Sequence, residues 1–223
     1  MKFIHGKPAA AIGKTLLIAD LHLGFEYELR QKGVLVELQY RAVAKEINAL
    51  LKQTRCTELV VIGDAKHDVY GFEDKEQRMM RAFFSLVKVK ATVVKGNHDS
   101  QLEKLEGIRV TKPEGILMRD VLLLHGHALP KEEDLKKAKT ILMAHEHPLI
   151  ELGEKKYKWS DKAWIIGRHS GKRFVIFPHF GRLISGRPFN KGGHLTPLLS
   201  QEECDDAEAI MLNGARLGKV GNL

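Results

Sequence analysis

The chain has 223 residues, 43% of them hydrophobic, which is enough for a substantial core and fits one large α/β domain over residues 1–223. No apolar run is long enough for a membrane span or a secretory signal, and the two cysteines form no CxxC pair, so the composition excludes a membrane protein and a disulfide framework and indicates a cytoplasmic location. The formal net charge of +8 is compatible with a polyanionic substrate.

Short apolar runs alternate with longer helical patterns in the first part of the chain. Five brief runs, each followed by a polar cluster, predict buried strands at 15–19, 59–62, 92–94, 121–124 and 141–144. Apolar residues at three-to-four spacing predict helices over 36–53 and 74–87, as expected of helices that cover a sheet.

Later segments favour strands and turns. The segment 115–126 predicts a hairpin that turns at Arg119-Asp120, and 209–220 predicts one that turns at Asn213-Gly214. Together the elements predict a layered sheet sandwich flanked by helices.

Each of the five predicted strands runs directly into residues that can bind a metal ion. The junctions read LLIADLH, LVVIGD, VVKGNHD, LLLHGH and LMAHEH. Polar groups at successive strand ends converge on one edge of an α/β sheet, where such folds place their sites. We therefore expect one meeting place for eight side chains: Asp20, His22, Asp64, Asn97, His98, His125, His145 and His147.

These residue types suit two divalent metal ions. Carboxylate, amide oxygen and imidazole favour manganese, iron or zinc over calcium or copper(I). Asp20 and His22 are two residues apart, as are His145 and His147, and in an extended segment such pairs point the same way. Asp64, at the tip of a strand, can offer one oxygen to each of two ions.

The motifs differ in how specific they are. A lone D-x-H is usually a turn or a core histidine, and Gly63-Asp64 alone is an ordinary turn. Gly96-Asn97-His98-Asp99 is sharper, because a glycine turn followed by these polar residues serves little packing purpose. The five motifs in order leave only a small chance of coincidence.

The ordered set resembles the calcineurin-like metallophosphoesterase superfamily, whose pattern is D-x-H, G-D, G-N-H-[DE], H and G-H-x-H. ADLHLG, GDAKHD, GNHD, HGH, AHEHP and LISG are also similar to archaeal phosphoesterases related to the repair nuclease SbcD and to bacterial phosphoesterases encoded beside a DNA ligase. The match runs from about Lys14 to Ser200. Ala65, Ala144 and Glu146 depart from the pattern without removing a ligand.

The resemblance implies a four-layer α/β/β/α sandwich and a site with two ions. It implies one ion on Asp20, His22, Asp64 and His147, and the other on Asp64, Asn97, His125 and His145, with Asp64 as the bridge. Manganese is the expected ion, and iron, zinc, nickel and magnesium are alternatives. Such a pair activates a bridging water and holds the phosphate oxygens during in-line attack.

Further residues are expected to act on the substrate. His98 is the candidate general acid for the leaving alkoxide, and Asp99 is expected to orient it. Lys66 and His67 are candidates to bind the phosphate. His127 is expected to support His125 or the leaving group, or else to be solvated. Three other histidines match no ligand position and are expected at the surface: His169, His179 and His194.

The predicted activity is that of a dinuclear-metal-dependent phosphodiesterase acting on nucleic-acid or nucleotide-type diesters. A phosphomonoesterase and a non-catalytic scaffold are the alternatives, and retention of His98 argues against the scaffold. Residues 151–191 carry ten Lys or Arg against three acidic residues. This basic segment predicts contact with a DNA or RNA backbone, or else a solvated face, through Lys155, Lys156, Lys158, Lys162, Arg168, Lys172 and Arg173.

Overall fold

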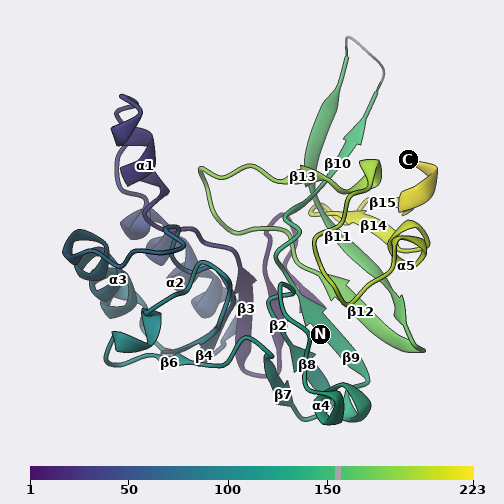
Figure 1. Ribbon diagram of the computed structural model, residues 1–223, viewed down its shortest axis with the longest axis horizontal. Coiled ribbons are helices and arrows are strands. Elements are labelled where there is room, and N and C mark those ends of the chain that lie inside the picture. The colour runs from purple at the N-terminus through teal and green to yellow at the C-terminus, as the bar shows by residue number, and fades with distance from the viewer. Residues whose placement is uncertain (154–156) are drawn as a thin grey trace.

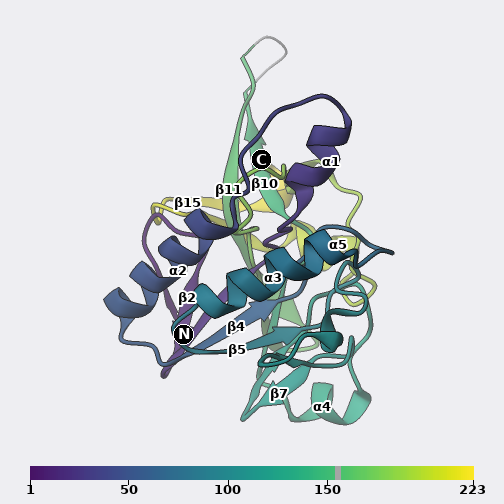
Figure 2. The same ribbon diagram turned by 90° about the vertical axis from the view of Figure 1, so that its left-hand side faces the viewer.

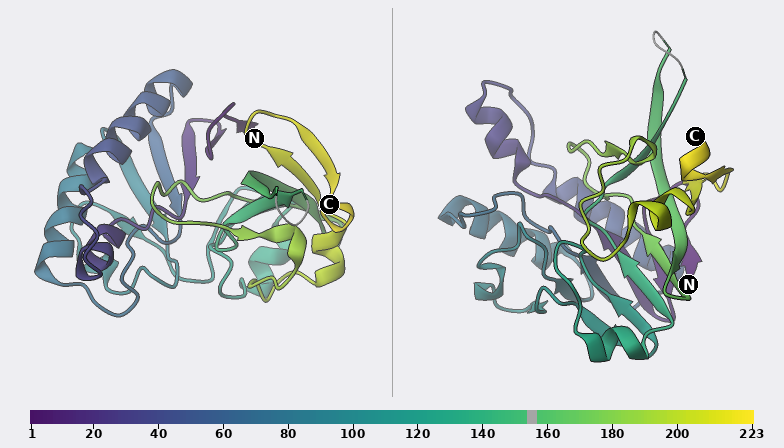
Figure 3. Two further views of the ribbon diagram at one scale, coloured as in Figure 1. Left: turned by 90° about the horizontal axis from the view of Figure 1, so that it is seen from above. Right: turned by 45° about the vertical axis from the view of Figure 1, so that its right-hand side comes forward.

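The computed structural model describes residues 1–153 and 157–223, and its strands form two sheets that pack face to face (Figures 1 and 3). The first sheet follows chain order and contains β1 (Lys2–Phe3), β2 (Ala10–Ile12), β3 (Thr15–Ala19), β4 (Glu58–Ile62), β5 (Lys90–Val94) and β6 (Arg109–Val110). Strands β3 to β6 are parallel, so their carboxyl ends lie at one edge.

The second sheet is mixed. Along its main path the order is β13 (Arg187–Pro188), β10 (Pro148–Leu152), β11 (Trp159–His169), β12 (Lys172–Ile176), β9 (Thr140–Met143), β8 (Val121–Leu123) and β7 (Ile116–Met118). The hairpin of β14 (Glu208–Met211) and β15 (Arg216–Lys219) joins it through β11. Strands β8, β9 and β12 are parallel and bring a second set of carboxyl ends together.

Apolar side chains fill the space between the two sheets. Leu17 and Val60 from the first sheet belong to the same buried cluster as Trp164, Val175 and Phe177 from the second. The Trp164 and Phe177 rings meet edge to face with centroids 4.8 Å apart, a favourable aromatic geometry. Strands β3, β4 and β9 are nearly continuous apolar runs because both of their faces are covered.

Helices cover the outer faces. Helices α2 (Tyr40–Thr54) and α3 (Asp74–Leu86) lie side by side over the first sheet (Figure 2), and α1 (Phe25–Gln31) stands beside them. The outer face of the second sheet is covered by irregular chain and two short helices, α4 (Glu132–Lys137) and α5 (Gln201–Asp205). The predicted α/β/β/α sandwich is therefore confirmed, with a thin fourth layer.

The five predicted strands and both hairpins form as expected. Helix α3 agrees within one residue, but α2 begins at Tyr40 rather than at residue 36. The preceding amide of Gln39 donates to the buried carboxylate of Glu26, which holds this segment outside the helix. No described helix combines the length and apolar character that a membrane span requires.

Candidate metal centre

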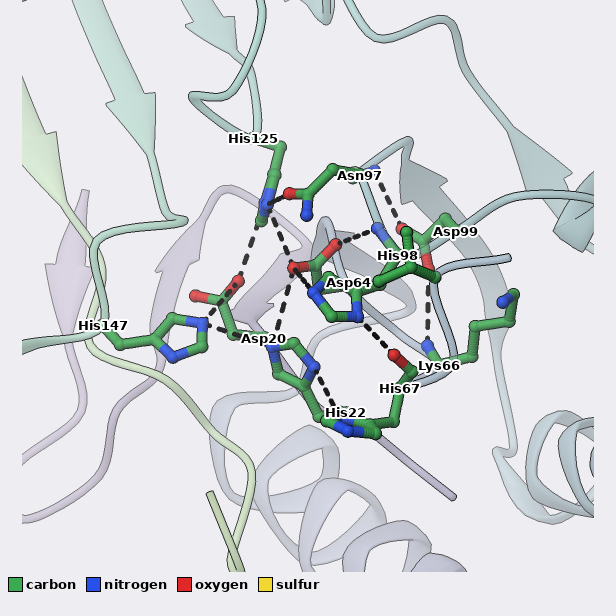
Figure 4. A network of polar contacts seen from close by, with 12 residues as sticks. Asp20, His22, Asp64, Lys66, His67, Asn97, His98, Asp99, His125 and His147 are labelled. Carbon is green, nitrogen blue, oxygen red and sulfur yellow. Dashed lines mark hydrogen bonds and ion pairs between the residues drawn. The ribbon is translucent and has the colours of Figure 1, made fainter. Parts of the chain in front are cut away.

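The carboxyl ends of strands from both sheets meet at one rim, and the candidate ligands follow these ends (Figure 4). Asp20 comes directly after β3, and Asp64 two residues after β4. His125 and His145 each come two residues after the ends of β8 and β9. Backbone hydrogen bonds join the first two loops, from the amide of Asp20 to the Gly63 carbonyl and from that of His22 to the Asp64 carbonyl.

The candidate ligands form two groups that share Asp64. One consists of Asp20, His22, Asp64 and His147, and the other of Asp64, His125 and His145; within each, the ligand atoms lie within 4.8 Å of one another. Asp64 Oδ2 lies 3.6 Å from Nε2 of His22 and 3.3 Å from Nε2 of His125. Asn97 adds Oδ1 to the second group, 3.2 Å from His125 Nε2. The sequence-based sets are thus brought together with Asp64 between them.

Asp20 shows that the residues fit metal ions. Its side chain is fully buried, and both carboxylate oxygens lack a hydrogen-bond donor in the described part of the chain. Oδ1 lies 3.4 Å from His147 Nε2 and 3.6 Å from His125 Nδ1. A buried, unsolvated carboxylate is costly unless a cation compensates it, and oxygen and imidazole together suit borderline divalent ions.

Burial and neighbouring charges shift the pKa values of three candidate ligands. Burial lowers the pKa of His125, but the nearby carboxylates of Asp64 and Asp20 outweigh it and raise that pKa to about 9. Burial would raise the pKa of Asp64, but the charge of His125 and its hydrogen bond hold it well below the usual range. Burial lowers the pKa of His145 to about 3, and the charge of His125 adds to this. The carboxylates thus create a field that stabilises positive charge at this rim.

The His125 ring is held in one orientation. Its Nδ1 lies 3.2 Å from the Ile62 carbonyl oxygen, to which it donates. Nε2 faces Asp64 and Asn97, so it is the nitrogen that offers a lone pair when a metal ion takes the place of its proton. Such a hydrogen bond to the far nitrogen is the usual way to orient a ligating histidine.

The paired ligands are aligned by turns and not by extended chain, which corrects the expectation from their spacing. Five candidate ligands have left-handed backbone, with φ of 51° at Asp20, 45° at His22, 48° at Asp64, 71° at His145 and 44° at His147. Each such residue costs about 1 kcal/mol, and strain of this kind is concentrated at functional sites. The turns aim alternate side chains inward.

Two glycines leave room for candidate ligands to pack against the backbone of neighbouring loops. A Cβ at Gly63 would overlap the His125 ring, and one at Gly96 would overlap the Asp64 carboxylate. We expect Gly96→Ala to displace Asp64, lower the metal content and destabilise the fold by about 1–3 kcal/mol, as overpacking does. Elemental analysis and thermal unfolding measure both effects.

Gly6→Ala is the control for that substitution. Gly6 has a φ of 69° with open space around it, so alanine there adds backbone strain of about 1 kcal/mol and no overlap. Its metal content should be unchanged. A Gly96→Ala protein that keeps its full complement of ions would contradict the steric argument.

His98 is positioned differently from the expectation. Its Nδ1 donates to the backbone carbonyl of His67, which leaves Nε2 facing the site, 3.9 Å from Asp64 Oδ2. The buried Asp99 carboxylate instead accepts from the amides of Ala65, Lys66 and Gly96. Asp99 therefore joins the loops after β4 and β5, and the direct partner of His98 is the His67 carbonyl.

Lys66 does not face the site, so its expected contact with phosphate is contradicted. The side chain is fully buried, and its ammonium donates to the carbonyls of Asp68 and Gly71, pointing away from the candidate ligands (Figure 4). Burial lowers the pKa of this lysine. Lys66 closes the loop that follows β4.

His67 links an acidic residue of α1 to a candidate ligand. Its Nε2 lies 2.9 Å from Glu28 Oε2, and its Nδ1 lies 3.3 Å from Nδ1 of His22. With Nε2 donating to Glu28, Nδ1 of His67 accepts from His22, whose Nε2 then stays free for a metal. Because both ring nitrogens of His67 are engaged, we infer that His67 orients His22. The predicted contact of His67 with phosphate is less favoured.

We expect Glu28→Ala to weaken metal binding by about 10- to 100-fold, the usual effect of losing the carboxylate behind a ligating histidine. Chelator competition measures this affinity. Lys32→Ala is the matched control, because it removes the exposed ion pair between Lys32 and Glu28 but leaves the Glu28–His67 contact in place. Equal affinities in the two variants would refute the link through His67.

Sequence reasoning missed two residues near the site. Glu28 lies in no recognisable motif, and only the packing of α1 shows that it contacts His67. His179 was expected at the surface, but it is buried with its ring 5.3 Å from that of His147, and burial lowers its pKa to about 2. A signal was present, because His179 follows the buried parallel strand β12 in the same way as the ligands follow theirs.

Other polar residues hold the surroundings in place. His127 is next to His125, with ring centroids 5.2 Å apart. His169 is half-buried and pairs with Glu203, and His194 is half-buried against Phe189. Glu146 is buried and accepts hydrogen bonds of 2.7 Å from the amides of Leu195 and Thr196. This residue, which departs from the family pattern, therefore anchors a loop distant in the sequence.

The basic segment is not arranged as one surface beside the site. Lys162 is half-buried and donates to the carbonyls of His179 and Gly181. Arg168 and Arg173 pair in the β11–β12 register beside Thr140, the first residue of β9, at the end remote from the ligands. Lys155 and Lys156 lie outside the described residues.

Comparisons with known proteins identify the family of this chain. A family model described as calcineurin-like phosphoesterase matches residues 13–186. The nuclease MPE of Pseudomonas putida is 18% identical over 92% of this chain and 88% of its own, with a TM-score of 0.61. The phosphoesterase YfcE from E. coli is 19% identical over 92% and 97%, with a TM-score of 0.40. A comparison with curated proteins gave no match.

At such identities, the likeness to solved structures shows the fold alone, whereas the family model covers most of the chain. The matched segment includes every candidate metal ligand and the buried groups of histidine and aspartate. The chain therefore belongs to the calcineurin-like phosphoesterase family and is a metal-dependent phosphoesterase.

Proposed function

We propose that this protein is a phosphodiesterase with two divalent metal ions that hydrolyses nucleotide-type diesters. The observation that carries the proposal is the pair of ligand groups sharing Asp64, with His98 Nε2 free beside them. Asp20, His22, Asp64 and His147 would hold one ion. The other would be held by Asp64, Asn97, His125 and His145, and manganese is the proposed metal for both.

The bound ions supply Lewis acidity and a water of lowered pKa. The residues of the chain supply position and a proton. Asp64 holds the amide of His98 through Oδ1 at 2.9 Å, so the general acid is tied to the bridging residue. His98, donating through Nδ1 to the His67 carbonyl, presents Nε2–H to the oxygen of the leaving group.

Nucleic acid remains within the proposed substrate class. The fold is shared with a protein named as a nuclease, and the net charge of +8 favours polyanions. Few of the described cations of the basic segment are near the candidate ligands. The positions of these cations therefore favour short diesters over long polynucleotides as substrates.

A metal screen with paired substrates tests the proposal. The metal-free protein is supplied with manganese, iron, zinc, nickel or magnesium and assayed on a diester and a monoester with the same leaving group. We expect kcat/KM for the diester to exceed that for the monoester. A preference for the monoester would identify a phosphomonoesterase, and inactivity with every metal would favour a scaffold.

A further inference from the structure

A cavity of about 440 Å³ opens beside the candidate metal centre, with His98 and His67 in its wall. In-line attack places the leaving group opposite the attacking water and next to the general acid. On the proposed function, the leaving group therefore occupies this cavity. Its lining then determines which part of a diester can be released.

Apart from His98, whose proton goes to the leaving oxygen, the described residues that line the cavity offer no unpaired cation to a second phosphate. Carboxyl groups of Glu28, Asp68, Glu73 and Glu76 line it, and its one lysine is Lys75. Lys75 Nζ lies 2.8 Å from Glu73 and 5.3 Å from the centre of the Tyr27 ring, so its charge is already engaged. Burial raises the pKa of Glu76 to about 7, so the charged carboxylates that a second phosphate on the leaving group would face are those of Glu28, Asp68 and Glu73. This part of the surface is acidic although the whole chain is basic.

The same lining suits an uncharged nucleoside. Carboxylates accept hydrogen bonds from sugar hydroxyls and from amino groups of bases. Tyr70, which is 89% exposed, borders the cavity together with the half-buried Tyr27, and aromatic rings stack on any base. The volume also lies within the range of small-molecule sites.

We infer that this cavity binds an unphosphorylated nucleoside, which is released as the leaving group of the diester. Water forms a bond to phosphorus, and the bond from phosphorus to the nucleoside oxygen breaks. His98 gives a proton to that oxygen and regains one from the water. The products are a phosphomonoester and a nucleoside with free hydroxyls.

A set of dinucleoside monophosphates tests the inference with the metal-loaded enzyme. Product analysis identifies which nucleoside leaves, and an extra phosphate is then placed on the leaving or on the retained nucleoside. We expect the phosphate on the leaving side to lower kcat/KM at least about tenfold, since an unpaired charge beside carboxylates is repelled. The phosphate on the retained side should have a smaller effect. Equal rates for the two isomers would overturn the inference.

Glu73→Gln probes the cause of this selectivity. The substitution frees Lys75 to pair with a phosphate, so the penalty should fall to about threefold or less. The matched control is Glu132→Gln, which removes a similar exposed Glu–Lys pair on α4 and should leave the penalty unchanged. An unaltered penalty in Glu73→Gln would overturn the role given to the lining.

Direct binding separates this inference from the proposed function. Calorimetry of the metal-loaded protein with adenosine should show binding that Tyr70→Ala weakens roughly tenfold, as loss of a stacking ring does. Tyr157→Ala, at an equally exposed tyrosine that does not line the cavity, should bind adenosine normally. Adenosine binding without diester cleavage would reject only the proposed function. Diester cleavage without adenosine binding would reject only the nucleoside cavity.

Discussion

Replacement of Asp64 by asparagine should abolish metal-dependent hydrolysis, with a rate loss of at least about 10³-fold, because two bound ions contribute several kcal/mol to the reaction. Oδ2 of Asp64 lies between Nε2 of His22 and Nε2 of His125, one from each ligand group. Asparagine keeps the shape and one acceptor oxygen but removes the charge that offsets two cations. Metal content should therefore fall together with activity.

Asp120→Asn is the control for this substitution. Asp120 is exposed in the turn between β7 and β8, and among the described residues its carboxylate has only a long contact, of 3.8 Å, with Lys139 Nζ. The same chemical change there should alter neither metal content nor rate. Circular dichroism should show a folded protein in both variants, and normal metal-stimulated turnover of Asp64→Asn would show that Asp64 does not bridge.

Replacement of His98 by alanine should slow hydrolysis of alkyl diesters by about 10²- to 10⁴-fold, the usual contribution of a general acid. Both ions should remain bound, because His98 belongs to neither of the groups that share Asp64. With a nitrophenolate leaving group the loss should shrink, since this group departs without a proton. The measurement is kcat on two diesters that differ only in the leaving group.

His169→Ala is the comparison for His98. His169 bonds to Glu203 and ends β11, next to Arg168 at the end of the sheet remote from the ligands, so its loss should leave both rates unchanged. If His98→Ala slows both substrates equally, His98 positions the phosphate or the loop and does not donate a proton. An unchanged rate on both would assign His98 to structure.

The sequence determined which residues meet at the site. Short buried strands can be recognised from local apolar runs, and parallel strands place their carboxyl ends at one edge whatever the details of packing. Asp20, Asp64 and His125 each follow such a strand, so their convergence was predictable without coordinates. Residue type then indicated divalent metals.

Only the tertiary structure decided where the side chains beyond the strand ends point. Lys66 and His67 are neighbours in one motif, but one is buried under its loop and the other faces the site. Left-handed turns and hydrogen bonds between distant loops set these directions, as between Asp99 and the amides of the loop after β4. The partnership of Glu28 with His67 and the position of the cavity likewise depend on how α1 packs. Contacts between segments far apart in the chain leave no local pattern, so the sequence alone could not place them.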